Sequence, residues 1–234
     1  MLGNLSGFAS PAIERLLKKL IADENNFNSE LRSLDREKLV LPIQLSTDDG
    51  REVQAFSRDV SEGGFGLITP QPFEQGDVAK AKVCFSDSAM EYLAECRWCA
   101  GFSDRYWTSG WQLKSGELEV DSIKSNEALM KWDVRTAERE KFAIPVVVHQ
   151  KGKLPQFHAF TRNMSGEGVN LVSNERVPEN SFCLLEFGRN DAEQCEIIAQ
   201  CVWSKQYGSS HWLMGFQFPR LDRVAKFHAA CFGR

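Results

Sequence analysis

The sequence predicts a mainly β protein made of two small six-stranded barrels in tandem, with flanking helices. Nine residues of the first half recur about 104 positions later, and a period of that length is the size of a whole domain. Each copy also contains six short strand-like runs separated by turns, which is typical of a closed sheet. The recurring residues are Arg32, Arg36, Pro42, Asp59, Ser61, Gly64, Cys96, Trp98 and Gly110, which match Arg135, Arg139, Pro145, Asn163, Ser165, Gly168, Cys201, Trp203 and Gly215.

A helical segment over residues 1–30 precedes the first copy. Ser10 is a helix-capping residue and Pro11 suits the first helical position. The apolar residues that follow fall on one helical stripe: Ile13, Leu16, Leu17, Leu20 and Ile21. The first barrel is expected over residues 31–116, with strands at 39–46, 51–60, 64–69, 78–86, 89–99 and 107–114.

The second barrel is expected over residues 133–234, after a linker or short helix at 117–132. Its strands are predicted at 142–150, 155–163, 168–173, 181–188, 193–204 and 211–218. A helix beginning at Pro219 is expected to end the chain and to pack an apolar face on the barrel. That face consists of Leu221, Val224, Phe227 and Cys231.

The composition indicates a soluble globular protein. Hydrophobic residues make up 42% of the chain and charged residues 26%, which predicts neither disorder nor a membrane span. Charges interrupt the first twenty or so residues, unlike the apolar region of a signal peptide. A net charge of −4 disfavours a protein that coats a nucleic-acid polymer through its overall field.

The seven cysteines are odd in number and lie mostly in apolar runs, which predicts reduced core thiols and a cytoplasmic location. Cys96 and Cys99 form a C-x-x-C pair, but the second copy has Ser204 at the matching position. Because no second pair completes a zinc set, no metal site is predicted.

Two arginines four residues apart begin each copy. Arg32 and Arg36 match Arg135 and Arg139. Two guanidiniums at this spacing can converge on a phosphate or on the O6/N7 edge of a guanine, because each presents a planar fork of donors. A solvated helical face is the alternative explanation.

The second motif is a short polar turn. It reads D-x-S-x-x-G at Asp59, Ser61 and Gly64, and N-x-S-x-x-G at Asn163, Ser165 and Gly168. Such residues can close a turn on their own backbone, and an isolated copy would predict only that. Both copies lie 23 or 24 residues after the second arginine, a span that fits one hairpin returning beside the arginine segment. This repetition favours a binding site.

Taken together, these motifs resemble the PilZ domain, a bacterial receptor module for cyclic di-GMP. The resemblance covers about residues 31–116 and 133–234 and includes Gly110 and Gly215 near the end of each barrel. It implies two antiparallel PilZ-type barrels, each able to bind cyclic di-GMP, with no other cofactor.

The resemblance also implies roles for individual residues. The arginine pairs Arg32 and Arg36, and Arg135 and Arg139, would grip phosphate and guanine. The turn residues would hold the other guanine from the barrel surface: Asp59, Ser61 and Gly64 in the first copy, and Asn163, Ser165 and Gly168 in the second.

Two departures from the family pattern bear on stoichiometry and affinity. Neither neighbour of the first arginine is an arginine in either copy: Leu31 and Ser33 flank Arg32, and Val134 and Thr136 flank Arg135. This favours one ligand per domain over an intercalated pair of ligands. The second copy has Asn163 for aspartate and Asn170 where the first has Gly66.

The sequence therefore predicts a non-enzymatic receptor or adaptor that changes its interdomain arrangement when it binds cyclic di-GMP. Its output through an unknown effector protein would be motility, exopolysaccharide or biofilm control. The alternative is a degenerate scaffold in pilus or flagellar control, in which one or both barrels do not bind nucleotide. A single-stranded nucleic-acid binder would need exposed aromatics among basic residues, whereas Trp98, Trp203 and Trp212 are expected in the core.

Overall fold

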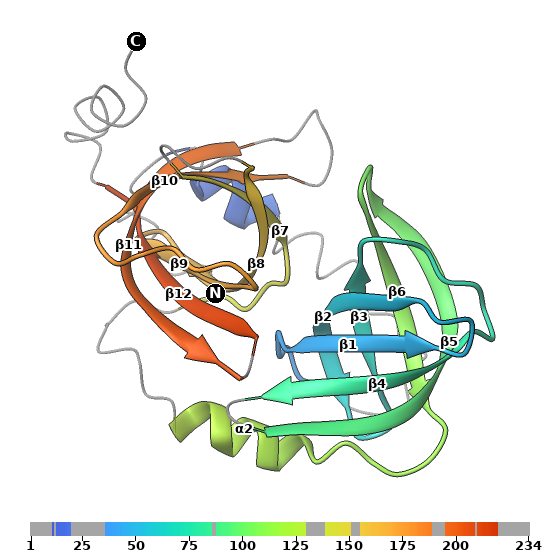
Figure 1. Cartoon of the computed structure of the whole chain (residues 1–234). Coiled ribbons are helices and arrows are strands. Elements are labelled where there is room, and N and C mark those ends of the chain that lie inside the picture. The colour runs from blue at the N-terminus through green and yellow to red at the C-terminus, as the bar shows by residue number, and fades with distance from the viewer. Residues whose placement is uncertain are drawn as a thin grey trace. The chain divides into compact units, whose positions relative to one another are not determined.

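The structure is a computed structural model of the chain (Figure 1). It describes residues 11, 13–19, 36–85, 88–129, 139–150, 155–188, 195–208 and 210–219, without the side chains of 126–129.

The first copy folds into a closed barrel, called barrel 1, with strand order β1-β2-β3-β6-β5-β4. All of its neighbouring strands are antiparallel. The strands are β1 (Pro42–Thr47), β2 (Glu52–Ser61), β3 (Gly64–Thr69), β4 (Val78–Phe85), β5 (Ser88–Ser103) and β6 (Tyr106–Leu113).

The second copy, barrel 2, repeats this topology as β7-β8-β9-β12-β11-β10. Its strands are β7 (Pro145–Gln150), β8 (Phe157–Ser165), β9 (Gly168–Ser173), β10 (Phe182–Phe187), β11 (Cys195–Tyr207) and β12 (His211–Gln217). The fold class predicted from the sequence, two six-stranded antiparallel barrels, is confirmed.

Alternate residues of each strand fill the barrel interiors, as the two-residue period of a strand requires. In barrel 1, for example, Val60, Phe65 and Trp111 lie in the core and come from three adjacent strands. Met164, Val169 and Phe216 occupy the matching positions in barrel 2. The intervening residues of β2 and β3, and of β8 and β9, therefore face outward.

One helix contributes to the core of each barrel. Ile123 of α2 (Val120–Leu129) is fully buried in the barrel 1 core, so the stretch predicted as a linker or short helix contains a helix packed on barrel 1. Residues 13–19 are helical, and Ile13 and Leu17 are buried in the core of barrel 2. The helix that precedes the first copy in sequence thus belongs to the second barrel. The helix predicted from Pro219 lies outside the described residues.

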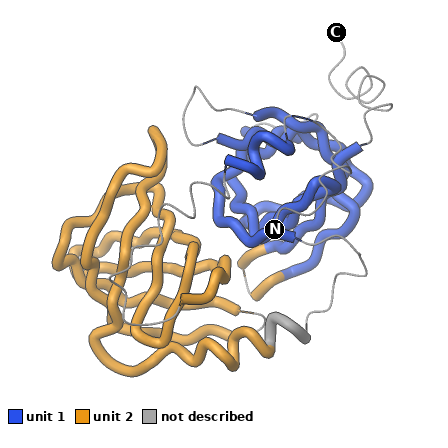
Figure 2. The backbone as a smooth tube through the Cα atoms, turned by 180° about the vertical axis from the view of Figure 1, so that it is seen from behind, with its two compact units in different colours: residues 1–31, 137–206, 212–234 blue, residues 32–136, 207–211 orange. Residues whose placement is uncertain are grey.

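The chain divides into two compact units, each built around one barrel (Figure 2). One comprises residues 1–31, 137–206 and 212–234, and the other residues 32–136 and 207–211.

The first strand of each barrel begins later than the sequence predicts. Leu39 and Leu41 are buried but lie before β1, because the Ser57 hydroxyl replaces part of the strand ladder. It donates to the Leu39 carbonyl at 2.6 Å and accepts from the Leu41 amide at 2.8 Å. Thr161 does the same in barrel 2, donating to the carbonyl of Phe142 and accepting from the amide of Ile144. A side-chain hydroxyl of this kind has no periodic signal in the sequence.

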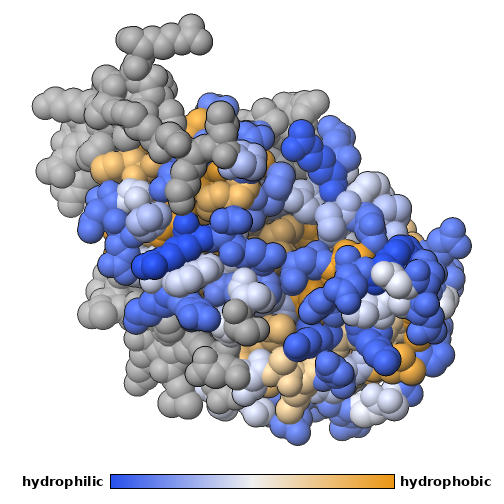
Figure 3. Space-filling model, viewed as in Figure 1, coloured by the Kyte–Doolittle hydropathy of each residue, from blue (hydrophilic) through white to orange (hydrophobic). Residues whose placement is uncertain are grey.

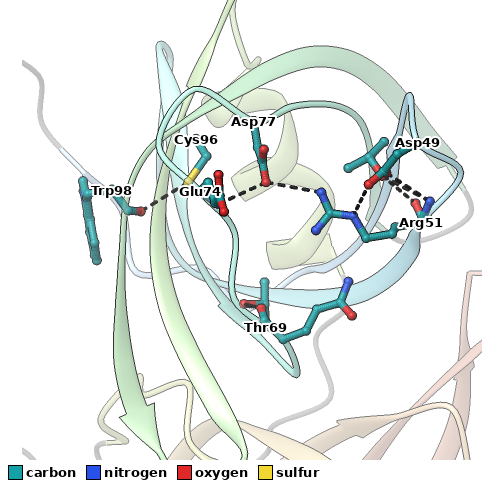
Figure 4. A network of polar contacts seen from close by, with 9 residues as sticks. Asp49, Arg51, Thr69, Glu74, Asp77, Cys96 and Trp98 are labelled. Carbon is teal, nitrogen blue, oxygen red and sulfur yellow. Dashed lines mark hydrogen bonds and ion pairs between the residues drawn. The ribbon is translucent and has the colours of Figure 1, made fainter.

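Polar side chains tie together the loops at one end of barrel 1 (Figure 4). Arg51 forms ion pairs with Asp49 at 2.7 Å and Asp77 at 3.3 Å, and Asp77 also accepts the Glu74 amide at 3.0 Å. No described helix is long and apolar enough to cross a membrane. The face drawn in Figure 3 is mainly hydrophilic, with smaller apolar areas.

Candidate functional site

The segment that carries the second arginine of each pair runs beside the second strand of its barrel. Glu37 and Val60 exchange backbone hydrogen bonds of 2.8 and 2.9 Å, and Glu140 and Met164 exchange bonds of 2.9 and 2.8 Å. The Ser57 and Thr161 hydroxyls then hold the next residues of each segment. This local pairing places Arg36 beside Asp59 and Arg139 beside Asn163.

In barrel 1 the carboxylate of Asp59 lies between two guanidiniums. Nη1 of Arg36 donates to Oδ1, while Nε and Nη2 of Arg58 lie 3.3 and 3.2 Å from Oδ2. The Arg58 and Asp59 side chains are only 8% and 10% exposed, but Arg36 is 25% exposed. Arg36 is therefore the most exposed member of the cluster, and part of the Asp59 carboxylate also reaches the surface.

A β-bulge explains how Arg58 and Asp59, although adjacent, can meet. The β2–β3 register shifts between Ser57 and Asp59, so Arg58 is the extra residue. A bulge bends the strand and re-aims side chains. Barrel 2 has the same shift between Thr161 and Asn163, with Arg162 as its extra residue.

The charges around Asp59 favour its ionised form. Burial raises the pKa of this carboxyl group, but the positive charges of Arg58 and Arg36 and their hydrogen bonds outweigh that effect. The net result is a pKa below the ordinary value of 3.8. Asp59 is thus an anionic hydrogen-bond acceptor at neutral pH.

Barrel 2 repeats the central contact with an amide in place of the carboxylate. Nη1 of Arg139 donates to Oδ1 of Asn163 at 2.8 Å. The structure therefore brings together Arg36 with Asp59 and Arg139 with Asn163. The other two predicted arginines, Arg32 and Arg135, lie outside the described residues.

The serine and glycine of each motif shape the turn that follows. The Ser61 hydroxyl donates to the Gly64 carbonyl at 3.3 Å, and Ser165 accepts the amide of Glu167 at 3.3 Å. These bonds are the local turn contacts that such residues can make without a ligand.

Both motif glycines are required by the close approach of a neighbouring strand. A Cβ atom on Gly64 would lie 2.1 Å from the Trp111 carbonyl oxygen, and one on Gly168 would lie 2.2 Å from that of Phe216. No real Cβ tolerates such a distance, so only glycine fits at either position. The need is a backbone contact and does not depend on a ligand.

A row of four residues crosses the outer face of barrel 1. In the strand registers Asp59 pairs with Gly66, Gly66 with Gly110, and Gly110 with Trp98. The carboxylate of Asp59 lies against Gly66 and the indole of Trp98 against Gly110. Since β3 and β6 are neighbouring strands, roughly 4.8 Å apart, the acid and the indole come close on the outer surface.

The expectation that Trp98 is a core residue is wrong. Its side chain points away from the barrel interior (Figure 4), and the residue is 37% exposed. A bulge between Cys96 and Trp98 turns the indole outward, and Gly110 gives it room to lie on the sheet. Trp203 lies against Gly215 in the same way, and Trp203 and Trp212 are both only partly buried.

Sequence reasoning did not place Arg58 or Trp98 on this face, and it identified Gly66 only as a difference from Asn170 of the second copy. Arg58 has a partner in the repeat, since Arg162 lies 104 positions later in the printed sequence. The repeat could therefore have identified it. Trp98 was recognised as repeated but was assigned to the core, because strand period alone does not reveal a bulge.

The cysteines of the described residues are all free. Burial, followed by the neighbouring Cys99 thiol, raises the pKa of Cys96 to about 11, so Cys96 is a neutral thiol. Its Sγ contacts the Trp98 carbonyl oxygen at 3.4 Å, and that of Cys201 contacts Trp203 at 3.4 Å. Within the described ranges no three His, Cys, Asp or Glu side chains cluster as metal ligands would.

A protein-family model described as the PilZ domain matches the chain twice, over residues 30–126 and 133–232. No curated protein matches it.

Several solved structures are similar to this chain at low sequence identity. PlzA of Borreliella burgdorferi in complex with c-di-GMP is 12% identical, with 92% of this chain and 99% of that chain covered and a TM-score of 0.33. YcgR of Escherichia coli in complex with c-di-GMP is 9% identical, with coverages of 95% and 91% and a TM-score of 0.32. The Bacillus subtilis inhibitor of motility MotI is 10% identical, with coverages of 82% and 94% and a TM-score of 0.31.

Proposed function

This chain belongs to the PilZ family, and from that premise we propose that it is a non-enzymatic receptor for cyclic di-GMP with one binding site on each barrel. The observation that carries the proposal is the repeated contact between the second arginine and the polar residue of the turn. Arg36 meets Asp59 and Arg139 meets Asn163, on the outer face of each barrel.

The chemistry of this pair suits the ligand. Cyclic di-GMP carries two phosphates and two guanines, and a guanidinium recognises a phosphate or a guanine O6/N7 edge through parallel hydrogen bonds. Asp59 and Asn163 offer acceptors for the N–H groups of a guanine. Arg32 and Arg135 complete the proposed site from the preceding chain, and Ser61, Gly64, Ser165 and Gly168 hold the turn.

Ligand binding at barrel 1 would also restrain the helix that leads toward the second copy. Nζ of Lys124 in α2 lies 2.7 Å from Oε1 of Glu37, the residue next to Arg36. This pair is nearly half exposed and is therefore weak, but the buried Ile123 anchors α2 to the same barrel. The arginine segment and α2 therefore form one connected surface.

We expect the bound receptor to favour a different interdomain arrangement from the free one, as a population shift. An effector protein would read that change and alter motility, exopolysaccharide or biofilm output. The odd number of cysteines, which lie mostly in apolar runs, supports a reducing compartment, and the proposed location is the cytoplasm.

Isothermal titration of the full chain tests the proposal. Cyclic di-GMP should bind at micromolar concentration or tighter, and GTP, which lacks the second guanine and the cyclic backbone, serves as the control. If neither nucleotide gives heat, the receptor proposal fails and a protein-interaction scaffold becomes the better description.

A further inference from the structure

We propose that the residue facing the Asp or Asn of the motif across the strand ladder makes the two barrels unequal. Barrel 1, with Gly66, would bind the guanine-bearing ligand more tightly than barrel 2, with Asn170. This inference rests on the proposed function and assigns a specificity role to residues 66 and 170.

The geometry of barrel 1 favours glycine at position 66. Asp59 and Gly66 are paired in the β2–β3 ladder. A Cβ atom at Gly66 would lie 2.9 Å from Oδ1 of Asp59, 3.0 Å from Oδ2 and 3.1 Å from Cγ. A side chain there would displace the carboxylate by a few tenths of an ångström or more from the position in which Arg36 and Arg58 hold it. Gly66 thus allows the carboxylate to lie on the sheet, where Arg36 and Arg58 hold it.

Barrel 2 has a side chain at this place. Asn163 pairs with Asn170 in the β8–β9 ladder, after the same register shift as in barrel 1. Because Asn170 has a Cβ and an amide where barrel 1 has Gly66, Asn163 has less room over the sheet than Asp59 has. The two barrels therefore present their motif acceptor differently to a ligand.

The rest of the row is alike in the two barrels and so cannot distinguish them. A Cβ on Gly110 would lie 2.1 Å from Nε1 of Trp98, and one on Gly215 would lie 2.0 Å from Nε1 of Trp203. Both barrels have the same indole on the same glycine. Among the four positions of the row, only 59/163 and 66/170 change chemistry.

Charge adds to the effect of shape. Asp59 is an ionised acceptor held by two arginines, and a carboxylate can accept two N–H bonds from the N1 and N2 positions of guanine. Asn163 is neutral and has one oxygen acceptor. Charge-assisted hydrogen bonds are roughly twice as strong as neutral ones, so barrel 1 should bind at least about tenfold more tightly.

Isothermal titration with cyclic di-GMP can measure each barrel separately in the full chain. The double change R135A and R139A removes both site arginines of barrel 2 and leaves barrel 1 to be titrated, and R32A with R36A leaves barrel 2. In the first background, G66N should weaken binding about tenfold. In the second, the double change N163D and N170G should tighten binding to within about threefold of barrel 1. Circular dichroism checks that each variant folds. The single change N170G also tests the inference in barrel 2, and it cannot misfold the barrel by steric overlap because it introduces no new side chain.

The outcomes separate the inference from the proposed function. If both single-site backgrounds bind with equal affinity and neither G66N nor the double change alters it, the inference is wrong while the receptor function stands. If the wild-type chain and both backgrounds give no heat, the receptor function itself is wrong. The inference is supported if barrel 1 binds more tightly than barrel 2 and the two affinities become more similar in the exchanged variants.

Discussion

At the scale of single residues, the site depends on how Asp59 is held. Arg36 approaches one carboxylate oxygen from outside the barrel, and the buried Arg58 approaches the other from the bulge. In the proposed site this arrangement would fix the acceptor before any ligand arrives, and a fixed acceptor lowers the entropy cost of binding. The same pairing costs stability when the carboxyl group is protonated, because its partners then lose their counter-charge.

Asp59 should therefore make folding stability depend on pH. Since the folded-state pKa of Asp59 lies below its ordinary value of 3.8, its contribution is complete above that value and is lost as the pH falls through the folded pKa. The difference in unfolding free energy between the wild type and Asp59→Asn should be constant from about pH 7 to pH 5 and shrink below about pH 4. Urea titrations across this range measure it, and a difference that stays constant down to about pH 2.5 would contradict the assignment.

At the scale of elements, the turn after β2 or β8 is shaped by its neighbours in the sheet. The Leu113 amide donates to the Gly63 carbonyl at 2.9 Å, and that of Phe218 donates to Glu167 at 2.9 Å. Gly64 also packs closely against β6, and Gly168 packs closely against β12. These contacts hold the turn on the barrel. The motif glycine is a packing requirement of the element as well as a family signature.

Gly64→Ala should accordingly destabilise the protein by about 3 kcal/mol, because its Cβ would meet a backbone carbonyl that cannot easily shift. Gly101→Ala is the matched control in the same barrel, since a Cβ there meets nothing within 4 Å. Chemical unfolding followed by tryptophan fluorescence gives both values. Equal stability of the two variants would show that the sheet relaxes around residue 64.

The sequence predicted these elements well where a pattern repeats. It predicted them poorly where a single side chain or a bulge determines the start of a strand or the direction of a side chain. The spacing between Arg36 and Asp59, matched by Arg139 and Asn163, correctly predicted which residues meet. The late start of β1 depends on the Ser57 hydroxyl, and the outward turn of Trp98 on a bulge, neither of which has a periodic signal. The burial of Ile13 in barrel 2 is a long-range contact, which local propensity cannot predict.

In the whole molecule, a ligand can change the interdomain arrangement only if its site is linked to the chain that joins the two copies. Arg36 and Arg139 both lie at the entry to a barrel, and α2 lies between them in sequence. A ligand that touches both an arginine and its barrel must immobilise the entering segment. For the second copy that segment follows α2.

Cyclic di-GMP should therefore increase the hydrogen-exchange protection of residues 116–139 and change the small-angle scattering profile of the full chain. Its influence is limited by how much more tightly it binds one arrangement than the other. GTP at the same concentration is the control. Unchanged protection and unchanged scattering at saturating cyclic di-GMP would place the output on the ligand-covered surface instead.

Titration of cyclic di-GMP into Arg36→Ala, Arg139→Ala and the double variant tests whether each arginine and its Asp or Asn partner form a ligand site. Each single change should weaken its own site roughly ten- to hundredfold, since charge-assisted bonds of about 1.5–3 kcal/mol are lost, and the double variant should weaken both sites by those factors. Arg105→Ala, which replaces an exposed arginine in the β5–β6 turn, should bind as the wild type does. Wild-type affinity in the double variant would contradict the claim.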